Sequence, residues 1–159
     1  MKRKYDNKGV TLVELLVVME ILSIAVGAAG ISISLAYSRD AEKCAKSINA
    51  ALENTRMLSL SEKGKFTMTL DMVNNQITID NSETGNVHTE NLQKKVKIYV
   101  PGKEELTSIS VRFDKSTGKV AAMDAEENGI LRITSENNTG KKASVVLVKG
   151  TGKHYVEYK

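Results

Sequence analysis

The stretch K8-G-V-T-L-V-E-L-L-V-V-M-E-I-L-S-I-A-V-G-A-A-G30 is strongly apolar, yet it contains two glutamates. From Val10 to Ala36 the only charged residues are Glu14 and Glu20. About 20 consecutive apolar residues are enough to cross a bilayer as a helix. This run therefore predicts a membrane-spanning helix over residues 10–36.

A secretory signal peptide is the first alternative, because it also combines a basic start, an apolar core and small residues at the cleavage site. A charged side chain at the centre of a membrane helix costs about 2.5–3.5 kcal/mol on insertion scales, and such residues are usually functional. A disposable signal has no use for Glu14 and Glu20, so the carboxylates favour a retained anchor. Basic flanks stay in the cytoplasm, which places the N-terminus inside and the chain beyond about residue 37 outside. The basic residues are Lys2, Arg3, Lys4 and Lys8.

Residues 8–16, K-G-V-T-L-V-E-L-L, resemble the processing site of type IV prepilins and type II secretion pseudopilins. In that family a membrane peptidase removes a short basic leader after a glycine, and the new N-terminus is methylated. The resemblance implies cleavage between Gly9 and Val10 and methylation of Val10, although the family most often has Phe at that position. It also implies that Glu14, the fifth residue of the mature chain, meets the terminal amine of a neighbouring subunit. An unpaired carboxylate in apolar surroundings would be costly.

Glu20 departs from the family pattern, in which this position is usually apolar. It follows Glu14 by six residues, about 240° around a helix, so the two carboxylates do not share a face. Four interpretations of Glu20 stay open: a tolerated polar residue, a protonated carboxyl, an assembly contact to a partner subunit, or the mark of a minor subunit with a dedicated neighbour.

Beyond the membrane segment, apolar residues recur at three- and four-residue spacing, which predicts that the helix continues over residues 37–64. These residues are Ala41, Cys44, Ala45, Ile48, Ala51, Leu52, Thr55 and Leu58. Gly64 has the position of a C-cap. Cys44 is the only cysteine, which excludes an internal disulfide, and it is interpreted as a small buried hydrophobe.

From residue 65 the apolar period changes to two, which predicts strands. A hairpin is expected around Asn74-Asn75. The predicted strands cover residues 66–70, 76–80, 95–100, 108–113, 118–123, 130–134, 143–148 and 154–158. We therefore expect an α+β chain, and the resemblance implies the type IV pilin-like fold. One long N-terminal helix, membrane-spanning in its first half, packs on an antiparallel β-rich head at residues 65–159, after removal of a leader at residues 1–9.

The composition gives no argument for an enzyme. The net charge of +4 belongs mostly to the first nine residues, since the remainder has 19 basic against 18 acidic residues. The sequence shows no Ser/His/Asp set, paired-carboxylate cleft or glycine-rich phosphate loop, and we expect neither a metal nor a cofactor. The turn at Asp80 begins like a calcium loop, but Asn91 stands where a bidentate acid is required.

The strand order resembles that of H-type minor pseudopilins and T-type minor fimbrial pilins. The matching motifs are R112-F-D-K-S-T-G-K-V120 and the closing G150-T-G152. This resemblance implies a non-enzymatic, minor structural subunit of a pilus or pseudopilus. It would reside in the cytoplasmic membrane as a single-pass protein with its head outside. The implied partners are other pilin or pseudopilin subunits, the prepilin peptidase, the inner-membrane platform and the assembly ATPase.

Two alternative functions follow from the same residues. A DNA-binding minor pilin of a competence pilus would neutralise phosphates with basic residues near the C-terminus. The candidates are Lys141, Lys142, Lys149 and Lys153. They lie on alternating strands and turns, with only Tyr155 or Tyr158 to stack a base, so a solvated rim is the preferred interpretation. The other alternative is an ordinary single-pass anchored protein that is never processed.

Overall fold

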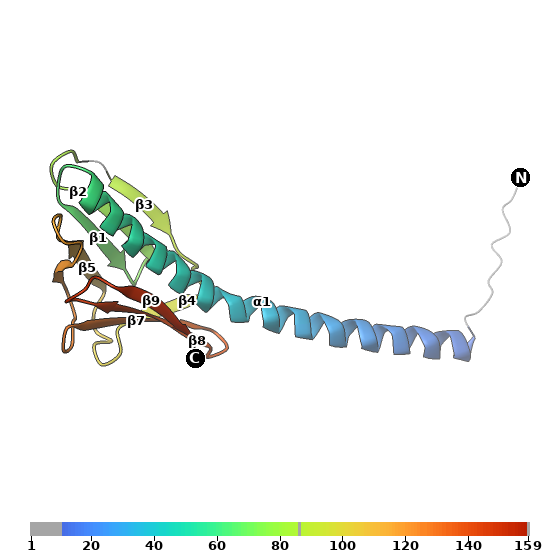
Figure 1. Ribbon diagram of the computed structural model, residues 1–159. Coiled ribbons are helices and arrows are strands. Elements are labelled where there is room, and N and C mark those ends of the chain that lie inside the picture. The colour runs from blue at the N-terminus through green and yellow to red at the C-terminus, as the bar shows by residue number, and fades with distance from the viewer. Residues whose placement is uncertain (1–10, 86, 159) are drawn as a thin grey trace, which may run out of the picture. The chain divides into compact units, whose positions relative to one another are not determined.

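A computed structural model describes residues 11–85 and 87–158, except for the side chains of residues 27–38 (Figure 1). Within these residues the chain has one helix and nine strands. The helix is α1 (Leu12–Ser61). The strands are β1 (Phe66–Asp71), β2 (Gln76–Asn81), β3 (Val87–Asn91), β4 (Val96–Tyr99), β5 (Ser108–Phe113), β6 (Val120–Met123), β7 (Ile130–Asn137), β8 (Lys142–Val148) and β9 (His154–Tyr158). The described residues divide into two compact units, the first ending at Ala36 and the second beginning at Tyr37.

The first unit contains the N-terminal part of α1. All side chains from Thr11 to Val26 are exposed, and most of them are apolar. A helix that is apolar on every side is stable only when lipid or other protein covers it. The expected membrane segment also includes Val10 and the side chains of residues 27–36, which lie outside the described part of the chain.

In the second unit, α1 buries one face against the head. The buried residues of this face are Ala41, Cys44, Ala45, Ile48, Ala51, Leu52, Thr55 and Ser59. They repeat the spacing expected from the sequence, and Leu58 is half-buried beside them. Cys44 is 1% exposed, which confirms its interpretation as a core residue. Thr55 and Ser59 are tolerated in the core because their hydroxyls donate to the helical carbonyls of Ala51 and Thr55, respectively.

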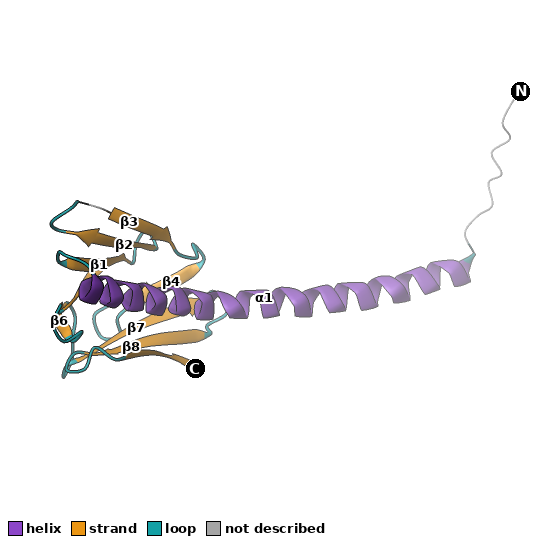
Figure 2. Cartoon of the chain, turned by 45° about the horizontal axis from the view of Figure 1, so that its top comes forward, coloured by secondary structure: helices purple, strands orange, loops and turns teal. Residues whose placement is uncertain are grey.

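The nine strands form two antiparallel sheets within the described residues. Their orders are β3-β2-β1-β5-β6 and β4-β7-β8-β9. In the first sheet Met68 pairs with Ile79 on one side and with Val111 on the other, so that buried residues lie side by side across the sheet. Figure 2 shows the C-terminal part of α1 lying along the sheets. The buried side chains of the helix and of both sheets form one hydrophobic cluster.

Turn chemistry accounts for the connections. Asn75 closes the predicted hairpin with a φ of 52°, a left-handed conformation that asparagine tolerates. Gly152 has a φ of 67°, and a Cβ atom at this position would lie 2.2 Å from the backbone oxygen of Gly118. The turn after β8 therefore packs directly against the turn after β5, and only glycine permits this approach.

The α+β class and the antiparallel character of the head are confirmed. The helix ends at Ser61, three residues before Gly64, and β7 extends to Asn137, beyond the predicted limit of residue 134. The strand β3 was not predicted, because all five of its residues are exposed and no apolar alternation marks the strand. The domain boundaries at residues 9, 36 and 64 stay predictions.

Candidate assembly site

Glu14 and Thr11 form a reciprocal hydrogen-bonded pair at the start of α1. The carboxylate oxygen Oε2 of Glu14 accepts from the Thr11 amide at 3.1 Å and from the Thr11 hydroxyl at 3.0 Å. The Glu14 amide donates to the Thr11 Oγ1 at 3.3 Å. Thr11 precedes the first helical residue, and its carbonyl accepts the first helical hydrogen bond, from the amide of Leu15. The pair is therefore a capping box, in which Thr is the N-cap and Glu occupies the third helical position.

This capped acid lies inside the segment with the basic leader and the apolar run. Residues 4–30 match the prokaryotic N-terminal methylation motif. The methylation motif supports a type IV pilin- or pseudopilin-type subunit, and such a subunit assembles with other pilin subunits. No curated protein and no solved structure matches the chain.

The structure locates only some of the predicted assembly residues. Gly9 and Val10, the expected cleavage and methylation sites, lie outside the described residues. Glu20 is exposed, and its side chain has no hydrogen bond or ion pair within the described part of the chain. Glu14 has a partner within its own chain, in addition to the neighbouring amine that the resemblance implies. The intermolecular pairing stays a prediction.

Among the residues described here, no helix is both long enough and apolar enough to cross a membrane.

The four lysines considered for DNA binding divide into two pairs at opposite ends of β8. Lys141 and Lys142 lie where the strand begins, and Lys149 and Lys153 lie in the turn that follows it. Lys142 forms an ion pair with Glu136 at 3.3 Å, and Lys149 forms one with Glu126 at 2.6 Å. Two of the four charges are therefore compensated within the protein, and the lysines do not form one continuous patch.

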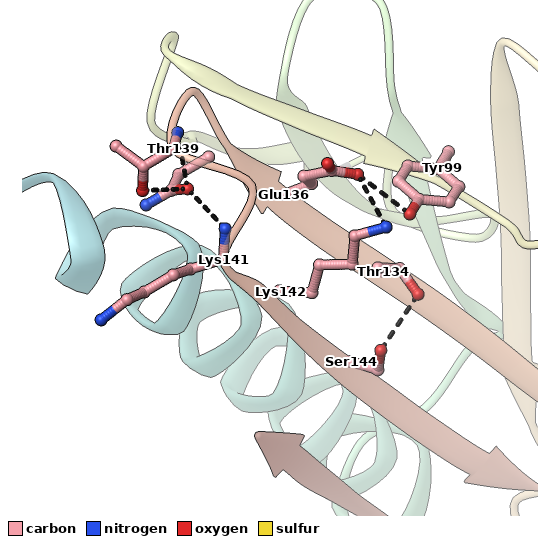
Figure 3. A network of polar contacts seen from close by, with 8 residues as sticks. Tyr99, Thr134, Glu136, Thr139, Lys141, Lys142 and Ser144 are labelled. Atoms are coloured by element: carbon pink, nitrogen blue, oxygen red, sulfur yellow. Dashed lines mark hydrogen bonds and ion pairs between the residues drawn. The ribbon is translucent and has the colours of Figure 1, made fainter. Parts of the chain in front are cut away.

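Figure 3 shows the surroundings of Lys142 on the outer face of the second sheet. The Tyr99 hydroxyl donates to Glu136 Oε2 at 3.1 Å, the same oxygen that Lys142 contacts. Hydrogen bonds from Lys142 and Tyr99 lower the pKa of the Glu136 carboxyl. Next to them, the hydroxyls of Thr134 and Ser144 lie 3.0 Å apart and are buried. The polar side chains on this face form hydrogen bonds and an ion pair with one another. This pairing argues against an open site for phosphates.

Sequence reasoning missed two interactions. The first is the capping box, although the signature T11-L-V-E14 before an apolar run could have revealed it. The second links β9 to α1: the Nε2 atom of His154 lies 3.0 Å from a carboxylate oxygen of Glu53. No local pattern joins these two residues, which are far apart in the sequence.

Proposed function

We propose that this chain is a minor structural subunit of a type IV pilus or of a type II secretion pseudopilus. A prepilin peptidase cuts the precursor after Gly9, and Val10 becomes the methylated N-terminus. Residues 10–36 hold the precursor in the cytoplasmic membrane, with the N-terminus inside and the head outside. The inner-membrane platform and its ATPase then draw the subunit into a filament.

The observation that carries this proposal is the position of Glu14. It is a carboxylate inside the methylation motif, one turn into a helix whose described residues up to Val26 are exposed and mostly apolar. Such a helix needs cover on all sides, first from lipid and then from the helices of neighbouring subunits. A carboxylate in that apolar surrounding favours an arrangement in which a cation approaches it, and the new amine at Val10 of a neighbour supplies one.

Two features support minor status. Glu20 places a second carboxylate where the family usually has an apolar residue. The head also has the motif from Arg112 to Val120 and a closing glycine turn, as H-type pseudopilins do. The close packing of Gly152 against the backbone of Gly118 explains why glycines occupy these two turns.

Mass spectrometry of the mature protein from its native host tests the processing. We expect Val10 as the N-terminal residue, carrying one methyl group. An intact Met1, or a cut near Ala29, would contradict prepilin handling and would favour an ordinary anchor or a signal peptide.

A pair of variants then tests assembly. Glu14→Ala should leave cleavage largely intact and block entry into filaments, because it removes the partner of the neighbouring amine. Glu20→Ala is the matched control for loss of a carboxylate from the same helix, and it should be incorporated to a greater extent than Glu14→Ala. Normal incorporation of Glu14→Ala would overturn the pairing role.

A further inference from the structure

Among the described residues, the Glu14 side chain forms hydrogen bonds with a single residue. Thr11 provides both donors to Oε2, and its hydroxyl oxygen receives the Glu14 amide. The second carboxylate oxygen, Oε1, accepts no hydrogen bond within residues 11–85 and 87–158. Within the described part of the chain the two carboxylate oxygens therefore differ, since Oε2 accepts two hydrogen bonds and Oε1 accepts none.

We infer that Thr11 is a positioning residue for assembly. Its hydroxyl fixes the Glu14 side chain at the start of the helix, engages Oε2, and leaves Oε1 as the oxygen that receives the amine of a neighbouring subunit. The inference rests on the proposed function, because it assigns to Thr11 a part in the same intermolecular pair.

The physical basis is the cost of a free carboxylate. A glutamate side chain has several rotatable bonds, and ordering it on assembly would cost conformational entropy. Thr11 orders it beforehand through hydrogen bonds to an ionised acceptor, which are stronger than neutral ones. The start of a helix also favours negative charge, because its free amides carry a partial positive charge. The precursor thus holds its carboxylate partly satisfied before any neighbour arrives.

The hydroxyl is the decisive group. Serine and threonine can donate to Glu14 and accept from its amide at the same time. Valine has nearly the same shape as threonine and no hydroxyl, so Thr11→Val loses two of the three hydrogen bonds and keeps the backbone amide. Thr11→Ser keeps all three donors and acceptors, and it is the matched control.

Incorporation into filaments in the native host is the main measurement, and cleavage is followed separately by mass spectrometry. We expect a fall of about tenfold in the filament fraction of Thr11→Val, the effect of losing one hydrogen bond to a charged group. Thr11→Ser should remain within about twofold of the wild type. Glu14→Gln retains an acceptor for Thr11 and lacks the charge, so its filament fraction should fall as that of Glu14→Ala does.

A second measurement does not depend on cleavage. In the full chain in detergent micelles, the Glu14 amide should exchange its hydrogen more slowly in the wild type and in Thr11→Ser than in Thr11→Val. This amide lies in the first turn of α1, where the amides lack helical carbonyl partners, and among the described residues it donates to the Thr11 hydroxyl oxygen. Equal exchange in the wild type and in Thr11→Val would overturn the inference.

The two proposals fail in different ways. If the wild type keeps its leader or is absent from filaments, the proposed function is wrong. If the wild type assembles and Glu14→Ala does not, while Thr11→Val assembles normally, only the inference about Thr11 is wrong. Equally poor assembly of Thr11→Ser and Thr11→Val would also overturn it, since the hydroxyl would then be irrelevant.

Discussion

His154 at the start of β9 contacts two acceptors at once, one of which is Glu53 of α1. Its Nε2 lies 3.0 Å from the carboxylate of Glu53, and its Nδ1 lies 3.1 Å from the carbonyl oxygen of Gly152. Each ring nitrogen therefore faces an oxygen atom, one from α1 and one from the turn before β9. The ring is 4% exposed and lies beside Phe113. The last strand of the sheet is thereby attached to the helix.

Replacement of His154 by alanine should therefore loosen this attachment. We expect His154→Ala to lower the free energy of unfolding by about 2–4 kcal/mol, through lost hydrogen bonds and a cavity. The measurement is urea denaturation of residues 37–159, which contain the described core. Glu53→Gln keeps an acceptor for Nε2 and should cost less than about 1 kcal/mol. Equal losses for the two variants would contradict this role of the ring.

Gly152 should be far less replaceable than a glycine in an open turn. Gly152→Ala combines a left-handed backbone with a contact of 2.2 Å to the Gly118 oxygen, and it should destabilise the protein by about 3 kcal/mol or more. Gly140 has a similar φ of 79° and open space around it, so Gly140→Ala should cost only about 1–2 kcal/mol. Thermal or urea denaturation of both variants checks the difference. A milder effect at Gly152 than at Gly140 would refute the packing argument.

The turn after β5 should give the head a stability term that depends on pH. The Thr117 hydroxyl and amide donate to the Asp114 carboxylate and lower the pKa of that carboxyl. The unfolded chain has an aspartate pKa of about 3.9, and the folded protein has a lower one. The ionised Asp114 carboxylate therefore stabilises the folded state above the unfolded pKa, and this stabilisation is lost as the pH falls through the folded pKa. Urea titrations at pH 7 and below pH 4 should show Asp114→Asn less stable than the wild type at pH 7 and closer to it in acid. If the difference in stability between Asp114→Asn and the wild type is the same at both pH values, the Asp114 carboxylate is not the origin of the pH dependence.

Binding of the head to DNA should be weak. Of the four candidate lysines, Lys142 and Lys149 are paired with glutamates, which leaves Lys141 and Lys153 of this set to contact phosphates. Two contacts predict a slope of at most about −1.8 for log K against log salt concentration. A gel-shift titration of residues 37–159 with a short duplex at several salt concentrations measures this slope. A much steeper slope would revive the DNA-binding alternative, and Lys141→Ala with Lys153→Ala would then test the lysines directly.

Much of the head could be predicted because its signals are local. The three- and four-residue spacing of apolar residues from Ala41 to Leu58 predicts the buried face of the helix, and glycines or asparagines mark the turns. The strand β3 could not be predicted, since none of its side chains is buried and its pairing with β2 depends on backbone hydrogen bonds. The engaged oxygen of Glu14 was missed although its signature is local. The contact of His154 with Glu53 has no local signal, because only the packing of β9 beside α1 creates it.

The burial of Cys44 has a practical consequence for mapping a filament. It is the only thiol in the chain, it lies in the core, and burial raises the pKa of its thiol, which keeps it from reacting as a thiolate. A cysteine introduced at an exposed position would therefore be the single reactive thiol of the folded protein. Cysteines introduced at two such positions would form a disulfide between adjacent subunits in oxidised cells only where the two surfaces touch. The buried native thiol would contribute no crosslinks of its own.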